Sequence, residues 1–408
     1  MNQHDTRTTP LIHIAHEWLT EWGGSEDVVR AILECLPEAK LSATINFLSA
    51  ENRVRFKVAD IQTTFLQHMP FVEKRFWNYL PLTPLAVESL DLSDADLIVS
   101  SSHAFAKGVL TTAEQLHISY IHSPMRYAWD LHFQYLRDYG LDTGIKGHLA
   151  RWVFHRLRLW DRQTANNVDL FLANSDHVRQ RIWRTYRRPA RVLYPPVKVE
   201  KFGLQREKDG YYISVSRLVS YKRMDLIVEA FRAMPGRKLV VIGDGPQLRS
   251  LQATCPPNVT LMGWQTDEVV RQYLANARAF VFAAHEDFGI SPVEAQACGT
   301  PVIAYGAGGS VETVRDMRFR PEPTGLLFEH QTAASLVQAV EAFENLGTRI
   351  NPDTCRRWAE TFSEARFAKQ FKALIETSWD EWKSDPQSLE ARIIGPLSNR
   401  HPTKETLA

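Results

Sequence analysis

Short apolar runs alternate with amphipathic stretches along most of the chain. Runs of about four to eight residues that are rich in valine, isoleucine and phenylalanine predict buried strands. Such runs occupy residues 11–15, 96–102, 117–122, 168–175, 190–195, 211–217, 238–245, 258–263, 277–284 and 300–305. Between many of them, stretches such as 25–36 and 223–234 carry apolar residues at helical spacing. Strands that alternate with helices predict βαβ units and mostly parallel sheets.

The predicted strands fall into two groups. The first group ends at residue 195 and the second begins at Tyr211, and the polar segment 197–210 between them predicts a linker. We therefore expect an α/β protein with two doubly wound domains that face a cleft, one over residues 1–197 and one over residues 198–363. Because such sheets bind ligands at the carboxyl ends of their strands, two of them make a two-sided site.

Composition narrows the class of protein. The 408 residues are 44% apolar and 23% charged, with a net charge of +1, which argues against a disordered chain and against a nucleic-acid-binding protein. The four cysteines form no CxxC pair, so we expect neither a disulfide framework nor a zinc cluster. No signal peptide and no run of about 18 apolar residues is evident. These features predict a cytoplasmic protein.

Two features of the first group of strands bear on function. Gly23 and Gly24 follow the first strand and precede a helix, for which Ser25 is the predicted N-cap. The turn either lets backbone approach an anionic ligand closely or is only a tight turn, and both interpretations stay open. His122 ends the strand at 117–122, and Ser123-Pro124 stops that strand at once, which places the imidazole at the edge of the cleft.

Cations follow the first strand of the second group. Arg217 and Lys222 lie after the strand at 211–217, where an arginine fork and a lysine point charge can hold a diphosphate. A solvated loop with spare cations is the alternative. Gly243-Asp244-Gly245 follows the strand KLVVI and predicts a tight turn lining the cleft.

The segment EDFGISPVE at 286–294 is the most informative part of the chain. Ser291, Pro292 and Glu294 fit the N-cap, N1 and N3 positions of a helix. Glu286 would sit at the end of the preceding strand, where a carboxylate can bind sugar hydroxyls. The loop before the helix would aim N–H groups into the cleft from Phe288, Gly289 and Ile290. A second glycine-rich turn, at 306–310, is another anion cradle or only a turn.

Together these segments resemble the retaining glycosyltransferases of family GT4, which have the GT-B fold. The matching segments, in family order over residues about 11 to 328, are HEWLTEWGGSEDVV, YIHSPMRYAWD, VDLFLANS, VLYPPV, SRLVSYKRMDLIVEAF, VVIGDGP, EDFGISPVEAQACGTPVIAYGAGGSVETV and TGLLF. EDFGISPVE matches the family's E-x7-E motif with both acids present. The resemblance implies a catalytic Glu286 on the reacting side of the transferred sugar and a Glu294 that holds the nucleotide ribose.

The resemblance also assigns the remaining site residues. Arg217 and Lys222 would neutralise the donor diphosphate, and His122 would meet the donor sugar near its anomeric centre. The Gly23-Gly24 loop would approach the phosphates and the acceptor from the other domain. Further donor contacts would come from Gly243 and from the N–H groups of Phe288, Gly289 and Ile290. The leaving phosphate would take the acceptor proton, with no metal and no cofactor.

The opening HEWL…GGSE and the string HSPMRYAWD look most like bacterial GDP-mannose-dependent mannosyltransferases of polysaccharide biosynthesis. This resemblance implies transfer of mannose to a lipid-linked or saccharide acceptor, in surface or exopolysaccharide synthesis. A UDP-sugar donor is the alternative within the family. A two-lobed sugar-binding protein without catalysis is the alternative from another class.

Two segments outside the motifs complete the prediction. In GT-B proteins the last helix returns to the first domain, and residues 364–384 suit that role, followed by a polar tail at 385–408. Residues 145–191 are rich in arginine, and one helical face there carries Arg151, His155, Arg158 and Arg162, opposite an apolar face with Leu149, Val153, Leu157 and Trp160. Either this face meets an anionic membrane at the inner side of the plasma membrane, or it is solvated.

Overall fold

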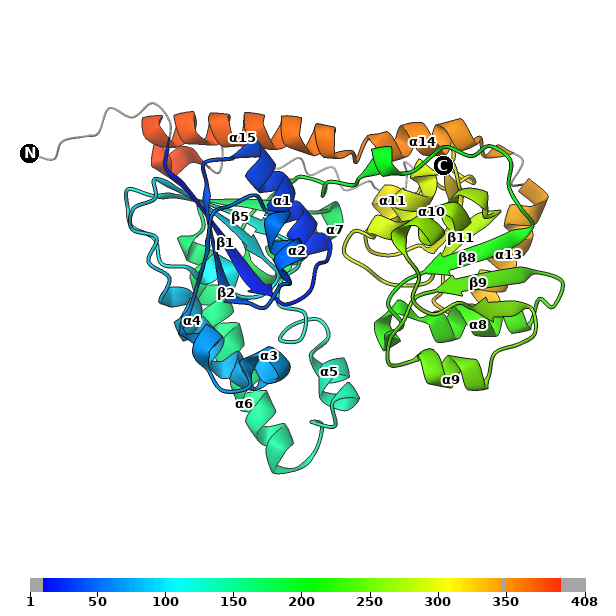
Figure 1. Ribbon diagram of the computed structural model, residues 1–408, viewed down its shortest axis with the longest axis horizontal. Coiled ribbons are helices and arrows are strands. Elements are labelled where there is room, and N and C mark those ends of the chain that lie inside the picture. Colours follow the sequence, from blue (N-terminus) through cyan, green and yellow to red (C-terminus); the bar gives the residue numbers. More distant parts are fainter. Residues whose placement is uncertain (1–9, 347–348, 390–408) are drawn as a thin grey trace, which may run out of the picture. The chain divides into compact units, whose positions relative to one another are not determined.

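The computed structural model describes residues 10–346 and 349–389. The chain forms two compact units, shown in Figure 1. Within the described residues, the N-terminal unit runs to Tyr194 and also takes residues 368–389, whereas the C-terminal unit spans Pro195–Phe367. The last helix, α15 (Glu364–Ser384), therefore makes most of its contacts with the N-terminal unit.

The N-terminal unit is built on a seven-stranded parallel sheet in the order β3-β2-β1-β4-β5-β6-β7. Its strands are β1 (Ile12–Leu19), β2 (Lys40–Asn46), β3 (Ile61–Thr63), β4 (Leu97–Ser102), β5 (Leu116–Ile121), β6 (Leu170–Ala173) and β7 (Arg191–Val192). Its other α-helices are α1 (Gly24–Cys35), α2 (Ala50–Val54), α3 (Val72–Arg75), α4 (Thr83–Glu88), α5 (His132–Asp138), α6 (Gly144–Thr164) and α7 (Asp176–Tyr186). The apolar runs did not predict β2 and β3.

The C-terminal unit has a six-stranded parallel sheet in the order β10-β9-β8-β11-β12-β13. Its strands are β8 (Tyr211–Val215), β9 (Lys238–Ile242), β10 (Val259–Leu261), β11 (Ala279–Phe282), β12 (Val302–Tyr305) and β13 (Gly325–Phe328). Its helices are α8 (Met224–Arg232), α9 (Leu248–Ala253), α10 (Asp267–Asn276), α11 (Ile290–Ala297), α12 (Ser310–Thr313), α13 (Ala333–Leu346) and α14 (Pro352–Glu360).

Both sheets have the strand order of a Rossmann-like fold, in which the chain starts at the centre and winds outward twice. In the C-terminal unit, α8 and α13 pack on one face of the sheet around Tyr212, Phe231 and Phe343, while α10 and α11 lie on the other (Figure 1). The predicted α/β class with two doubly wound parallel sheets is confirmed. In each unit the carboxyl ends of the central strands lie at one edge, where the predicted site residues follow.

Two predicted helix caps are wrong. Helix α1 begins at Gly24, so its N-cap is Gly23 rather than Ser25, and the Glu26 carboxylate accepts the Gly23 N–H at 2.9 Å. Helix α11 begins at Ile290 with Gly289 as its N-cap, which places Ser291 and Pro292 inside the first turn. In both helices the N-cap lies two residues earlier than predicted, because a glycine takes the capping position.

The long helix α6 packs differently from the prediction. Leu157 is buried as expected, but Leu149 is 60% exposed and faces away from the core. Arg151 donates to the carbonyl oxygen of Asp142 at 2.6 Å and Arg158 donates to that of Ala128 at 3.0 Å. The predicted basic face therefore supplies two contacts that hold the unit together.

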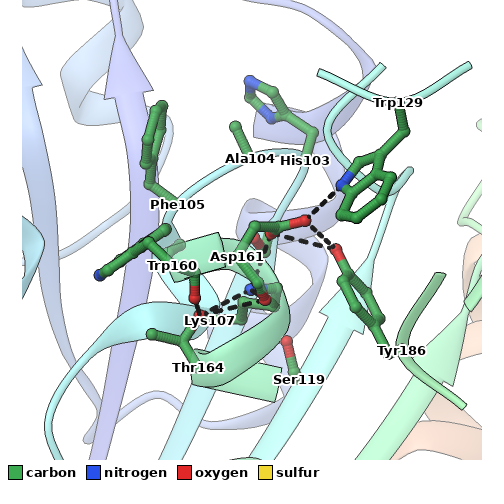
Figure 2. A network of polar contacts seen from close by, with 12 residues as sticks. His103, Ala104, Phe105, Lys107, Ser119, Trp129, Trp160, Asp161, Thr164 and Tyr186 are labelled. Carbon is green, nitrogen blue, oxygen red and sulfur yellow. Dashed lines mark hydrogen bonds and ion pairs between the residues drawn. The ribbon is translucent and has the colours of Figure 1, made fainter. Parts of the chain in front are cut away.

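An ion pair joins Lys107, in the 3₁₀ turn after β4, to Asp161 on α6 (Figure 2). Lys107 and Asp161 are 1% and 0% exposed, and Nζ lies 2.8 Å from Oδ1. Nζ also donates to Oγ1 of Thr164 at 2.8 Å, while Oδ2 of Asp161 accepts from Trp129 Nε1 at 2.7 Å and from the Tyr186 hydroxyl at 3.1 Å. The network joins the segment after β4 to α6 and α7.

Little of the predicted polar tail can be assessed. A short 3₁₀ turn spans Pro386–Ser388, and Leu389 is buried. Residues 390–408 of the predicted tail lie outside the described residues. No helix within the described ranges is long and apolar enough to cross a membrane.

Candidate functional site

A buried carboxylate organises the carboxyl edge of the N-terminal sheet. Glu17 near the end of β1 is 0% exposed, and its Oε1 accepts the N–H groups of residues 103–106 at 2.8–3.0 Å and the Ser102 hydroxyl at 2.9 Å. Burial opposes ionisation, but His103 and the N–H donors outweigh it, so the pKa of Glu17 is lowered. The carboxylate thus holds the loop after β4 at the edge of the sheet.

The predicted Gly23-Gly24 turn is held by a second buried carboxylate. Glu26 is 5% exposed and accepts from Gly23 N and from the Ser25 hydroxyl, each at 2.9 Å. Nε2 of His16, on β1, lies 3.4 Å from Oε1 of Glu26. Burial opposes the charge on Glu26, but the hydrogen bond and charge of His16 outweigh it and lower the pKa of this carboxyl to about 2.

This pKa predicts how stability responds to acid. The folded-state value lies below the ordinary 4.5, so ionised Glu26 stabilises the fold above about pH 5 and the contribution is lost as the pH falls toward 2. We expect Glu26→Gln to cost about 2–3 kcal/mol at pH 7 and progressively less below about pH 4.5. Urea unfolding from pH 7 to 3 measures this, with the exposed Glu38→Gln as control. An undiminished cost at pH 3 contradicts the assignment.

Three imidazoles gather at this edge. The ring of His103, after β4, lies 6.5 Å from that of His16 and 6.4 Å from that of His122, after β5. His122 Nε2 contacts the Ser101 hydroxyl at 2.8 Å. Burial lowers the pKa of His103. Burial also lowers the pKa of His122 well below its ordinary value, and the charges of His103 and His16 add to this effect. His122 is therefore neutral at pH 7.

The C-terminal sheet carries a pair of opposite charges at its carboxyl edge. Lys222 ends a 3₁₀ turn after β8, and Glu286 follows β11, the neighbouring strand. Lys222 Nζ contacts Oε1 of Glu286, and the two side chains are only 17% and 18% exposed. The same Nζ lies 6.0 Å from the centre of the Phe282 ring. The structure thus brings together two of the predicted catalytic residues.

The glycine-rich turn after β12 supports Glu286. Gly309 N donates to the Glu286 carbonyl oxygen at 2.8 Å, and Gly308 pairs with Glu286 in a β-bridge. Gly308 has a φ of +68°, and a Cβ there would lie 2.2 Å from that oxygen. Of the two interpretations left open for this turn, the geometry favours a structural role, because its backbone packs directly against the EDFG loop.

The rest of EDFGISPVE forms the start of α11. The Phe288 side chain is buried against Phe362, and Gly289 caps the helix. The first N–H groups of a helix have no partner within it, so the backbone at Ile290 is suited to an anion. Glu294 lies in the second turn, half-buried, and is not a helix cap.

The remaining predicted residues occupy the same edge. Arg217, after β8, is exposed. Gly243 follows β9 with a φ of +145°, and a Cβ there would lie 1.8 Å from the carbonyl oxygen of Ser216. Glycine at this position is therefore required by the packing of the turn on the end of β8. A contact of Gly243 with a donor stays a prediction.

Sequence reasoning missed His16, Glu17, Glu26 and His103. The signal was present in HEWL, where a histidine and a glutamate interrupt a strand that is otherwise apolar. Among the described residues, no group of three or more His, Cys, Asp or Glu side chains is placed to hold a metal ion.

Comparison with protein families identifies the chain. Residues 164–363 match the model of the glycosyl transferases group 1, and residues 22–201 match that of glycosyltransferase family 4. The two matches together extend from residue 22 to residue 363. The chain belongs to these glycosyltransferases.

Curated relatives of this glycosyltransferase differ in their substrates. D-inositol 3-phosphate glycosyltransferase from Mycobacteroides abscessus is 30% identical over 193 residues, which are 41% of this chain and 42% of the relative. Glycogen synthase from Pseudomonas aeruginosa is 34% identical over 149 residues, 35% of this chain and 28% of the relative. The chain thus spans less than half the length of these relatives.

Solved structures match nearly the whole glycosyltransferase. HepE from Anabaena, solved with UDP-glucose, is 16% identical and has a TM-score of 0.64. The match covers 90% of this chain and 100% of the HepE chain. Sucrose-phosphate synthase from Thermosynechococcus elongatus is also 16% identical, with coverages of 90% and 99% and a TM-score of 0.66. These likenesses bear on the fold alone, and they confirm the predicted GT-B architecture of two Rossmann-like domains.

Proposed function

We propose that the protein is a retaining glycosyltransferase that moves mannose from GDP-mannose to a lipid-linked or saccharide acceptor in surface or exopolysaccharide synthesis. The observation that carries the transferase activity is the Lys222–Glu286 pair at the carboxyl edge of the C-terminal sheet, supported by the turn at Gly308-Gly309. The mannose donor rests on the segments HEWL…GGSE and HSPMRYAWD.

The arrangement suits departure of a nucleoside diphosphate. Departure builds negative charge on the β-phosphate and positive charge on the sugar ring. Lys222 and Arg217 supply cations for the phosphate, together with the N–H groups at the start of α11. A phosphate oxygen then takes the proton of the acceptor hydroxyl as the new glycosidic bond forms on the same face, so neither glutamate becomes a nucleophile. With these cations in place, no metal ion and no other cofactor is needed.

The other residues bind and orient the donor. The Glu286 carboxylate accepts hydrogen bonds from sugar hydroxyls, and Lys222 is shared between Glu286 and the diphosphate. Glu294, on α11, accepts from the ribose hydroxyls. Neutral His122 bonds to the sugar near the anomeric carbon, and the Gly23-Gly24 turn, clasped by Glu26, lets backbone approach the phosphates.

A donor screen by calorimetry tests this function. We expect GDP and GDP-mannose to bind more tightly than UDP, UDP-glucose and UDP-GlcNAc. Lys222→Ala and Glu294→Ala should each weaken binding by about tenfold or more, because each removes a charged partner of the nucleotide. The exposed Lys238→Ala, at the opposite end of its strand, is the control. Binding of no nucleotide at all contradicts the proposed site.

A UDP-sugar donor is the second candidate. The observation in its favour is that HepE, a structural neighbour, was solved with UDP-glucose. Tighter UDP than GDP binding in the same screen would select it and leave the catalytic residues unchanged. A sugar-binding protein without catalysis is distinguished by assay, since it would bind the donor and release no nucleoside diphosphate in the presence of acceptors.

A further inference from the structure

The exposed side of α6 carries an unusual set of side chains. Ile145, Leu149, Trp152 and Leu159 are 89%, 60%, 60% and 54% exposed. Their spacing of four, three and seven residues places them along one side of the helix. We call these four residues the α6 outer stripe. Large, solvent-exposed apolar side chains aligned over several turns of one helix indicate a surface that binds a membrane or another molecule.

Helix α5, which packs on the buried side of α6, also exposes aromatic side chains. Helix α5 precedes α6, and its ring of His132 lies 5.4 Å from that of Phe154 on α6. Phe133 and Tyr139, at the two ends of α5, are each 69% exposed. In the view of Figure 1, the amino end of α6 and α5 extend beyond α3 and α4, away from the sheet. The exposed rings of α5 and the first residues of the stripe therefore belong to the same protruding part of the N-terminal unit.

Charge identifies the partner. Helix α6 contains five basic residues and one acid, Asp161, which is buried and paired with Lys107. Lys146, Arg156 and Arg162 are exposed beside the stripe. A second copy packed on the stripe would bring equal positive charges together, whereas an anionic lipid surface offers both phosphates and an apolar layer. Tryptophan and arginine are suited to that boundary.

Side-chain contacts also fix the position of α6 within the N-terminal unit. Its carboxy-terminal half is fixed through the Lys107–Asp161 pair, and Trp160 Nε1 donates to Glu88 Oε1 at 2.6 Å. The outer stripe therefore has a defined orientation relative to the N-terminal sheet. Because α6 is fixed in this way, binding of its outer stripe to a surface would orient the whole N-terminal unit on that surface.

We propose that the α6 outer stripe docks on an anionic membrane surface. The helix lies in the plane of the headgroups, with the four apolar side chains at the acyl boundary and Lys146, Arg156 and Arg162 on lipid phosphates. The purpose of this docking rests on the proposed function, because docking brings the proposed transferase site to an acceptor held in the membrane. The binding itself requires no donor.

Vesicle co-sedimentation of the full chain tests the proposal. We expect binding to phosphatidylcholine vesicles that contain phosphatidylglycerol, weak binding to phosphatidylcholine alone, and loss of binding at high salt. The double variant Leu149→Ser/Trp152→Ser and the variant Arg156→Glu should each bind at least about tenfold less. Trp264→Ser, which removes a tryptophan that is 71% exposed in the other unit, is the matched control.

Several results would contradict the proposal that the outer stripe docks on a membrane. They are no vesicle binding by the wild type, equal binding by the stripe variants, or a dimer in sedimentation that Trp152→Ser abolishes. Circular dichroism and donor calorimetry of the variants show whether they fold and keep the nucleotide site. Failure of vesicle binding with donor binding intact rejects only this surface, whereas failure of donor binding with vesicle binding intact rejects only the proposed function.

Discussion

Lys222→Ala is expected to lower kcat/KM for sugar transfer by about 10²–10³-fold. In the structure the ammonium contacts Glu286 and the Lys222 side chain is only 17% exposed, so the charge acts in a poorly solvated place. Without it, the departing diphosphate would lose a cation and would also meet the uncompensated carboxylate of Glu286. The loss should therefore fall on kcat as well as on donor affinity. Initial rates of nucleoside diphosphate release measure both constants.

Two companion variants make the result specific. Lys222→Arg keeps the positive charge and should recover part of the lost rate, while Glu286→Gln keeps the size of the side chain and removes its charge. Lys238→Ala, at the amino end of β9, removes an exposed lysine from the opposite edge of the same sheet and should leave the rate unchanged. A Lys222→Ala enzyme within about threefold of wild type would show that the ammonium does not serve the transition state.

Much of the fold could be predicted because central strands of parallel sheets are nearly continuous apolar runs. Strand β2 was missed because it contains polar side chains that find partners inside the sheet. Ser42 lies 2.7 Å from His13 and donates to Gln62 at 3.0 Å, and Thr44 donates to the Glu17 carbonyl oxygen at 2.8 Å. Such pairing crosses strands, so the local pattern does not reveal it.

Some residues of the candidate site could likewise be predicted from the sequence, and others could not. Glu286 and Lys222 lie in local motifs at the ends of strands, and the structure places them in contact. Glu17 acts on backbone that lies 86 to 89 residues further along the chain, so no spacing in the sequence announces its role. Glu26 was passed over as one residue of a glycine-rich turn, although its carboxylate is what holds that turn.

The Lys107–Asp161 pair is another feature that only the structure reveals. The two residues are 54 positions apart in the sequence, and no motif contains them. Their charges balance each other with almost no exposure to water, and the Trp129 and Tyr186 donors complete the hydrogen bonds of the carboxylate. Removal of one charge leaves the other buried without a counter-ion, which is far more costly than loss of an exposed pair.

We therefore expect Lys107→Met to lower the free energy of unfolding by about 3–5 kcal/mol, measured by urea denaturation. Lys107→Met/Asp161→Asn should be less destabilised than the single variant, because the amide still accepts from Trp129 and no charge remains buried. Lys40→Met, which breaks the exposed Lys40–Asp94 pair, should cost about 1 kcal/mol or less. Equal costs for the Lys107 and Lys40 variants would mean that water reaches the network. Because α6 is tied to the segment after β4 through this pair, Lys107→Met should also loosen the outer stripe and weaken vesicle binding.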